Sequence, residues 1–302
     1  MSIKSQILGS TFETINVIIL EKGGEIMSVV AFMNMKGGVG KTTLCVNLAD
    51  ILSREFNKKV LVIDIDPQFN ATQCFMSGEA YQNHKIQSKY TAFNIYADNI
   101  EVPSLVSGRV AQNNQEINLE DMILKSNSNL DYIPGDLNLI KVETGRNGQE
   151  MRLQRFIREN NLKEKYNYIF IDCPPTNSLW TLSAIVASDF YIMPVKPDYL
   201  SSVGLSLFKS VTGELIKNYA SSIKCIGVVF TMTEPNTNLT QQIRSSVTAS
   251  ADFGDKVYSA EMRRTTRIAS IQRERGFVLD LNDSHTNDLK RIAREFLGRV
   301  EN

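Results

Sequence analysis

Short runs of apolar residues that end abruptly in polar ones are the strongest structural signal along this chain. Most runs are apolar throughout rather than at every second position, which is typical of strands buried on both faces of a parallel sheet. The pattern predicts five such strands, over residues 29–33, 59–64, 168–172, 190–194 and 223–230.

Stretches that are compatible with helices separate these strands. They predict helices over residues 43–56, 148–160, 178–187, 204–219 and 288–299. Because strands and helices alternate, the sequence predicts an α/β fold: a doubly wound, mostly parallel sheet with helices on both faces. In such a fold the ligand lies at the carboxyl edge of the strands.

Two segments depart from this alternation. Residues 1–27 form an N-terminal extension without the basic start and cleavage site of a signal peptide. Residues 21–27 could be encoded by purine-rich codons that resemble a ribosome-binding site just before a start codon. We therefore predict that the extension is non-native or poorly ordered and that the natural chain begins at Met27. Residues 77–129 are polar and irregular, and we interpret them as helices and loops within one domain spanning 28–302.

The clearest chemistry lies in Lys36-Gly37-Gly38-Val39-Gly40-Lys41-Thr42-Thr43, between the first predicted strand and the first helix. A glycine loop in that position surrounds phosphate oxygens with backbone N–H groups, and the helix dipole adds to the attraction. Lys41 can then reach the β- and γ-phosphates, and the Thr42 hydroxyl can ligate Mg²⁺. The usual spacing asks for glycine at Met35, and here a second lysine, Lys36, follows instead. The alternative is a glycine-rich turn with solvated lysines, which would not need the flanking strand and helix.

Two of the predicted strands end in carboxylates. Asp172 closes one strand, and a carboxylate there can hold Mg²⁺, usually through water, opposite the Thr42 hydroxyl. Asp64 and Asp66 end another, where one of them could orient an attacking water beside the phosphates. The alternatives are a capping aspartate at position 172 and a solvated turn at Asp66, because Asp-Pro is itself a turn signal.

Composition narrows the classes of protein. Among 302 residues, 33 are Lys or Arg and 33 are Asp or Glu, so binding to DNA would need a local basic patch. The four cysteines form no C-x-x-C pair and the two histidines are far apart, so neither a zinc site nor a disulfide framework is indicated. No apolar run approaches the roughly 18–20 residues of a membrane span. These features predict a cytoplasmic protein.

Three motifs together resemble the ParA/Soj branch of the deviant-loop ATPases, a group that also includes MinD-like proteins. The motifs are the loop at 36–43, the run over 60–72 and the run over 169–175. Weaker similarities extend the resemblance over roughly residues 28–299. It implies the P-loop NTPase fold and an enzyme that hydrolyses ATP, with ATP and Mg²⁺ as cofactors.

The resemblance also implies a role for each candidate residue. The protein would form a homodimer around two ATP molecules, with Lys36 reaching the partner's nucleotide as an arginine finger does. The catalytic residues would be Lys36, Lys41 and Asp66, with Asp66 activating water. Met232 would pack against adenine, although core packing explains this methionine equally well. The metal site would comprise Thr42, Asp64 and Asp172. The nucleotide would be held by Met232 and the loop residues Lys36, Gly37, Gly38, Val39, Gly40, Lys41, Thr42 and Thr43.

Two departures from the family pattern affect these expectations. Phe69 follows Asp-Pro-Gln where the family commonly has glycine, which puts the local turn and the dimer interface in question. After Thr231-Met232 the family often has an acidic residue and then Arg-Thr, but here the run over 233–237 lacks that arginine.

Five arginines within 13 residues, from Arg263 to Arg275, suggest a DNA surface. The family binds DNA nonspecifically through basic residues in this region, and such phosphate-directed binding weakens steeply with salt. We predict Arg263, Arg264 and Arg267 as the DNA contacts. The alternative is a solvated helix face with internal Arg–Glu pairs.

The implied function is an ATP-driven switch for plasmid partition or chromosome segregation. ATP would build a nucleoid-associated dimer, and a ParB-like centromere-binding protein would stimulate its hydrolysis. The alternative is a MinD-like, membrane-associated spatial regulator, which would use a terminal amphipathic helix. We expect the helix from Leu289 to Val300 to pack on the domain instead, so no membrane partner is expected. A reductase of the same superfamily would need an iron–sulfur cluster, and Cys173 and Cys225 offer no clear ligand set.

Overall fold

The structure is a computed structural model that describes residues 27–87, 90–97, 118–142, 148–199, 201–219, 222–234 and 237–301. The prediction for the N-terminal extension therefore lies outside the described residues, apart from Met27. Within the described part of the chain, no helix combines the length and the apolar character that a membrane crossing requires.

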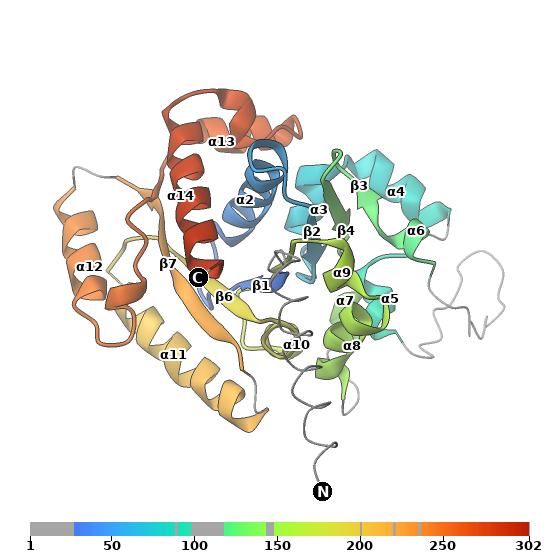
Figure 1. The fold of residues 1–302 in the computed structure, drawn as a ribbon, viewed down its shortest axis with the longest axis horizontal. Coiled ribbons are helices and arrows are strands. Elements are labelled where there is room, and N and C mark those ends of the chain that lie inside the picture. The colour runs from blue at the N-terminus through green and yellow to red at the C-terminus, as the bar shows by residue number, and fades with distance from the viewer. Residues whose placement is uncertain are drawn as a thin grey trace, which may run out of the picture.

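An eight-stranded sheet forms the centre of the molecule (Figure 1), with the strand order β3-β4-β2-β5-β1-β6-β7-β8. Strand β3 runs antiparallel to β4, and the other neighbouring strands are parallel. The strands are β1 (Ser28–Phe32), β2 (Val60–Asp64), β3 (Leu124–Lys125), β4 (Leu130–Ile133), β5 (Tyr168–Asp172), β6 (Phe190–Val195), β7 (Lys224–Thr233) and β8 (Met262–Arg263).

Helices fill most of the connections between the strands. The α-helices are α2 (Lys41–Glu55), α3 (Asn70–Phe75), α4 (Gly78–Ile86), α5 (Ala92–Tyr96), α6 (Leu119–Met122), α7 (Leu139–Val142), α8 (Arg152–Glu159), α9 (Leu162–Lys165), α10 (Leu179–Ala187), α11 (Ser201–Asn218), α12 (Asn238–Thr248), α13 (Thr266–Arg273) and α14 (Ser284–Val300). Three 3₁₀ turns are η1 (Gln149–Met151), η2 (Gly254–Lys256) and η3 (Val278–Leu281).

Both faces of the sheet are covered, as the continuous apolar runs predict. Successive side chains of a strand point to opposite faces, and in β1 Ala31 joins a buried cluster with Trp180 of α10, whereas Phe32 joins a cluster with Phe296 of α14. The ring of Phe170 lies 4.9 Å from that of Phe32 and 5.6 Å from that of Phe296, measured between ring centroids. Helices α2 and α14 thus share one face, and α8 and α10 share the other.

The predicted fold class and the five predicted strands are confirmed, but three strands were missed. Strand β3 lies inside residues 77–129, for which the sequence predicts helices and loops only. Strands β3 and β8 have two residues each and β4 has four, too short for a distinct apolar run. Strand β8 also means that the arginine-rich segment is not one continuous helix, because α13 begins only at Thr266.

The C-terminal helix α14 packs on the domain, as predicted. Its residues Leu289, Ile292, Phe296 and Val300 are all buried, in one cluster with residues of α2 and of the central strands. Its apolar face is therefore covered by the protein itself.

Helix α2 buries a carboxylate that should make stability depend on pH. Burial raises the pKa of Asp50 from its ordinary 3.8 to about 7, although Arg54 opposes this rise. Asp50 Oδ1 accepts no hydrogen bond within the part of the chain that the structure describes, and Arg54 Nη1 lies 3.2 Å from Oδ2. Because the folded-state pKa is raised, the stability that the protonated carboxyl contributes is complete below pH 3.8 and is lost as the pH rises to about 7.

Replacing Asp50 by asparagine removes this titration and keeps the side-chain shape. We expect the gain in unfolding free energy over the native chain to be larger at pH 8 than at pH 5, by about 2–3 kcal/mol. Urea unfolding at the two pH values measures the difference. An equal effect of Asp50→Asn at both pH values would contradict the assignment.

Candidate functional site

The glycine loop between β1 and α2 has the conformation that its sequence predicts. Gly38 and Gly40 adopt positive φ angles of 69° and 79°, a left-handed region that favours glycine. Gly40 is the N-cap of α2, and its carbonyl accepts the backbone N–H of Leu44 at 2.9 Å. The Thr231 hydroxyl donates to the Val39 carbonyl at 2.6 Å, which ties the loop to β7.

Lys41 folds back over this loop. Its ammonium donates to the carbonyl of Lys36 at 3.2 Å, and the residue is buried, with 6% of its surface exposed. Burial lowers the pKa of Lys41, while Asp172 opposes that shift. An ammonium held across the mouth of a loop of N–H donors is placed to bind a phosphate.

Asp172 and Thr42 form the part of the site that suits a divalent cation. The Thr42 hydroxyl donates to Asp172 Oδ2 at 2.7 Å, whereas the buried Oδ1 accepts no hydrogen bond from the described residues. Burial raises the pKa of Asp172 well above its ordinary range, and the neighbouring Asp64 adds to the rise. A buried, incompletely satisfied carboxylate beside a hydroxyl fits Mg²⁺, which prefers oxygen ligands and keeps several waters.

Asp64 supports this site from the neighbouring strand. It pairs with Asp172 in the register of β2 and β5. Its Oδ2 accepts from the backbone N–H and the hydroxyl of Thr72 at 2.8 and 2.7 Å, and Oδ1 accepts from Asp66 N–H at 3.2 Å. Burial raises its pKa to about 7, although these hydrogen bonds oppose the rise. Its oxygens are therefore engaged in fixing the segment that carries Asp66.

Asp66 is the carboxylate that faces the cavity. Its Oδ1 accepts the backbone N–H of Gln68 at 2.8 Å, and 4% of the residue is exposed. Burial raises its pKa, while the Gln68 N–H and Lys41 oppose the rise.

Among the described residues no group of three or more His, Cys, Asp or Glu side chains could hold a metal, so a cation here would also need phosphate oxygens or water as ligands.

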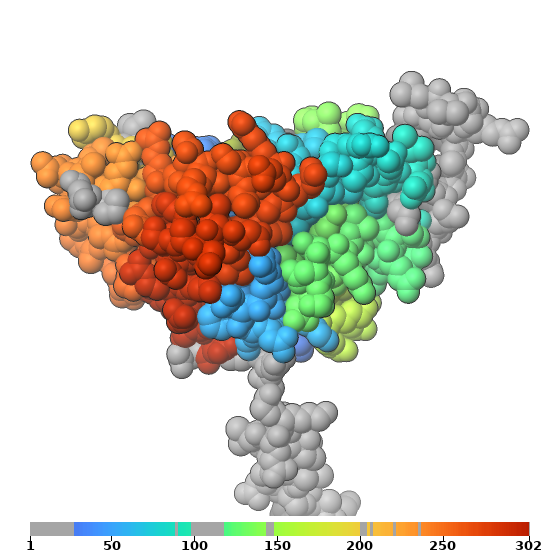
Figure 2. All heavy atoms as spheres, turned by 90° about the horizontal axis from the view of Figure 1, so that it is seen from above, coloured from blue at the N-terminus to red at the C-terminus, as the bar shows by residue number. Residues whose placement is uncertain are grey.

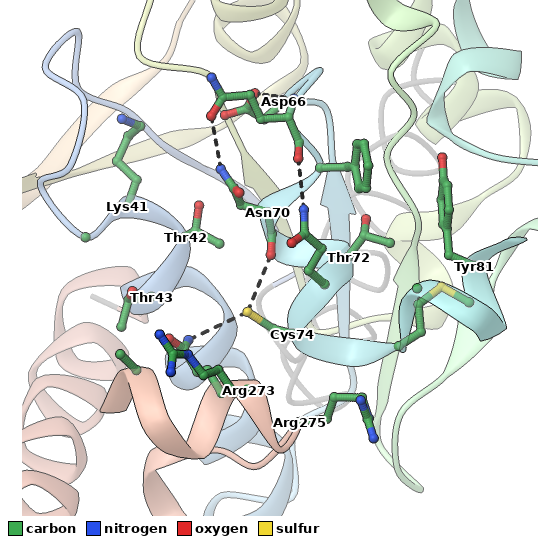
Figure 3. Close-up of a pocket in the computed structure, with 18 of the residues that line it drawn as sticks. Lys41, Thr42, Thr43, Asp66, Asn70, Thr72, Cys74, Tyr81, Arg273 and Arg275 are labelled. Atoms are coloured by element: carbon green, nitrogen blue, oxygen red, sulfur yellow. Dashed lines mark hydrogen bonds between the residues drawn. The ribbon is translucent and has the colours of Figure 1, made fainter. Parts of the chain in front are cut away.

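A cavity of about 990 Å³ opens beside these groups (Figure 3). On one side it is lined by Gly37, Gly38, Gly40, Lys41, Thr42 and Thr43 of the loop, with Asp66 and Met232. Lys36, Val39, Asp64 and Asp172 are not part of its lining. Figure 2 shows the orange-red C-terminal surface beside the cyan surface of residues 70–87, and the cavity is lined from both.

Lys36 does not point into this cavity. Its ammonium forms an ion pair with Asp198, which precedes α11, and its backbone N–H donates to Asn34 Oδ1 at 2.9 Å. About a third of the Lys36 side chain is exposed. In the single chain the lysine that is predicted to act in trans is thus held by a carboxylate of its own subunit.

Three residues on the cavity wall have a backbone conformation that is unusual for their type. Phe69, Met232 and Arg275 have φ angles of 42°, 52° and 59°, and the other non-glycine residues with positive φ in the described chain are all asparagines. All three line the cavity. A left-handed residue other than glycine or asparagine costs about 1 kcal/mol, and such strain clusters at functional sites.

Phe69 occupies a backbone position whose left-handed conformation favours glycine. It is the N-cap of α3 and adopts the left-handed conformation despite its side chain. The ring stacks on Tyr81 of α4 with a centroid distance of 5.1 Å and an interplanar angle of 7°. The turn that was in question therefore forms, and the stacking offsets part of its strain.

Sequence reasoning missed the far wall of the cavity. Cys74 and Tyr81 line it from α3 and α4, and Gln272, Arg273 and Arg275 line it from the end of α13. A sequence signal for Arg275 exists. Gly276, the residue after it, is of a type that commonly marks the end of a helix, and charged residues cluster just before this glycine.

The three arginines predicted to contact DNA lie outside the cavity and are ion-paired. Arg263 Nε lies 2.5 Å from Asp288, Arg264 Nη1 lies 2.9 Å from Glu234, and Arg267 pairs with Asp283. Asp283 is the N-cap of α14, so this pair also fixes a helix start. The guanidinium of Arg264 is the most exposed of the three.

Known proteins that are similar to this chain identify its family. A family model described as an AAA domain matches residues 27–225. The sporulation initiation inhibitor protein Soj of Bacillus subtilis is 32% identical over 244 residues, which cover 80% of this chain and 86% of Soj. The chain belongs to the ParA/Soj family of P-loop ATPases.

Other relatives agree with this membership. The chromosome partitioning protein ParA of Caulobacter vibrioides is 28% identical, over 90% of this chain and 95% of that protein. A plasmid partition protein structure from Borrelia burgdorferi superposes with a TM-score of 0.65 at 21% identity, covering 91% of this chain and 99% of that one. The ATP complex of a McdA variant of Cyanothece gives 0.71 at 20% identity, covering 91% and 98%. These two likenesses concern the fold. As a member of this family with an intact loop, the chain is an ATPase with ATP and Mg²⁺ as cofactors.

Proposed function

We propose that this chain is a partition ATPase that dimerises when it binds ATP, binds DNA nonspecifically in that state and so positions a plasmid or chromosome. The observation that carries the proposal is the pair of lysines of the loop. Lys41 lies over the phosphate cradle, whereas Lys36 points away from it, into an ion pair with Asp198. A lysine that does not serve its own nucleotide is available to serve that of a second copy.

The remaining groups then divide the chemistry. The loop N–H groups and Lys41 bind the phosphates, and Mg²⁺, when bound at Thr42 and Asp172, neutralises phosphate charge. Asp66 orients the attacking water and accepts its proton. Lys36 of the other subunit stabilises charge that develops on the transferring phosphoryl group, which makes the dimer depend on the γ-phosphate.

The DNA surface of this proposal comprises Arg263, Arg264 and Arg267. They lie in β8, in α13 and in the short link between them, and α13 ends at the cavity wall, so a nucleotide-dependent change could reach them. Their carboxylate partners lower the net charge of the surface, and we propose that phosphates compete with those carboxylates. The partner that stimulates hydrolysis would be a ParB-like centromere-binding protein.

Replacing the three arginines together by alanine is expected to weaken DNA retention strongly and to leave ATP affinity unchanged. The plot of log K for DNA binding against log salt concentration has a negative slope. Losing three phosphate contacts should make this slope less steep by about 3. A filter-binding titration with nonspecific duplex DNA and a nonhydrolysable ATP analogue measures this slope.

Because Asp288 is buried, the alanine at position 263 removes one partner of a buried charge, although Arg291 also contacts that carboxylate at 2.7 Å. A second variant, Arg264→Ala with Arg267→Ala, keeps the Arg263–Asp288 pair and should make the slope less steep by about 2. An unchanged slope in both variants would reject the arginine assignment.

The dimer itself is tested by light scattering of the purified chain with ADP, with ATP and with the analogue. The proposal expects a dimer with the analogue and a monomer with ADP. If the mass with the analogue stayed that of one chain, the trans role of Lys36 would be excluded. Sedimentation with liposomes would instead support the MinD-like alternative.

A further inference from the structure

The far wall of the nucleotide cavity carries two arginines that have no partner of opposite charge among the residues that the structure describes. Among the residues that line the cavity, Lys41, Arg273 and Arg275 are the basic ones, and Asp66 is the acidic one. In the described chain, Arg263, Arg264 and Arg267 each pair with a carboxylate, whereas Arg273 and Arg275 have none within 4.0 Å. The wall therefore presents uncompensated positive charge to whatever fills the cavity.

The backbone of Arg275 has a left-handed conformation, with a φ angle of 59°, that is usually found for glycine. The N–H of Gly276 donates to the Ile271 carbonyl at 2.9 Å, and that of Arg275 donates to the Gln272 carbonyl at 3.0 Å. This pair of bonds ends α13 as a Schellman motif, in which the left-handed residue is usually glycine. Packing does not explain the side chain, because Arg275 is exposed at the cavity rim.

The end of α13 is also held in a fixed place relative to α3. Gln272 Nε2 donates to Cys74 Sγ of α3 at 3.7 Å, and the ring of Phe277 lies 5.7 Å from that of Phe75. In Figure 3, Arg273 and Arg275 are drawn at the end of α13, and both line the same cavity as Thr43 and Cys74. The two guanidinium groups are thus carried by a helix end that contacts with α3 hold in place.

We propose that Arg273 and Arg275 are nucleotide-binding residues that act in cis. Arg273, which lines the cavity together with Thr43, donates hydrogen bonds to the α-phosphate or ribose side of the nucleotide, and Arg275 adds attraction at the outer rim. Guanidinium groups match phosphate oxygens in geometry and charge. Contacts to this part of the nucleotide are shared by ATP and ADP, so the two arginines set affinity and leave the chemical step to Lys36, Lys41 and Asp66.

The test measures the affinities of fluorescent ATP and ADP analogues without DNA, together with kcat at saturating ATP. Arg273→Ala is expected to weaken both affinities by about 10-fold and to leave kcat within about 2-fold. Arg275→Gly is expected to weaken both by about 3-fold while the Tm stays equal or rises by about 2 °C, because glycine relieves the left-handed strain. Weaker binding without lower stability separates a ligand contact from a structural role.

Arg294→Ala is the matched control, since it removes one exposed arginine of α14 that does not line the cavity. It should leave both nucleotide affinities unchanged. The inference rests on the ATPase assignment, and a native chain that bound neither analogue would refute that assignment rather than this role. If native affinity persisted in both Arg273→Ala and Arg275→Gly, the proposal would be overturned, and loss of DNA retention in the same variants would assign the arginines to DNA.

Discussion

Replacing Lys36 by alanine is expected to lower ATP turnover by at least about 10³-fold, because a cation supplied in trans to a transferring phosphoryl group contributes about 10³–10⁵ to kcat in comparable enzymes. The structure supports a role outside the chain's own cavity, because the Lys36 ammonium pairs with Asp198 and does not line the cavity. Monomeric ATP affinity should stay within a few-fold of native, since Lys41 and the loop N–H groups remain. Steady-state phosphate release and the affinity for a fluorescent ATP analogue measure the two effects. Light scattering with a nonhydrolysable analogue reports the dimer, which this variant is expected to lose.

Asp198→Asn is the matched control for this variant. It removes the carboxylate that holds Lys36 in the single chain and keeps the ammonium. If that ion pair competes with dimer formation, the variant should dimerise at the same or a lower ATP concentration than the native chain and should keep its turnover. Native turnover in Lys36→Ala would show that no catalytic cation comes from this position.

Replacing Asp66 by asparagine is expected to lower turnover by about 10²–10⁴-fold and to leave the ATP-bound dimer intact. The carboxylate is buried, faces the cavity and has a pKa raised by burial, all of which suit a group that takes a proton from water. Asparagine keeps the acceptor for the Gln68 N–H but cannot take that proton. The variant should therefore accumulate as an ATP dimer, visible by light scattering with hydrolysable ATP and by slow phosphate release.

Asp255→Asn, at an exposed position of η2 that does not line the cavity, should behave like the native chain. The two measurements also separate the roles of the two site residues. Lys36→Ala is expected to lose both the dimer and turnover, whereas Asp66→Asn is expected to lose turnover alone. An Asp66→Asn chain that turned over at the native rate would move the general base to another residue.

Local patterns were enough to predict the centre of this fold. Strands that are buried on both faces need apolar residues at every position, so β1, β2, β5, β6 and β7 are visible as runs. The short strands β3 and β8 have two residues each, and tertiary pairing with β4 and β7 defines them. A strand that depends on its neighbour for definition leaves no periodic signal of its own.

The sequence by itself determined the phosphate loop, because positive φ at Gly38 and Gly40 and an ammonium at Lys41 are local requirements of that turn. The sequence also determined at which edge of the sheet Asp172 and Asp66 lie beside the phosphate loop, since parallel strands bring their carboxyl ends together. Only the tertiary structure decided that Lys36 pairs with Asp198 and that Arg275 lines the same cavity as Lys41. These contacts join residues more than 150 positions apart, and their distances depend on how helices pack on the sheet, which no local pattern encodes.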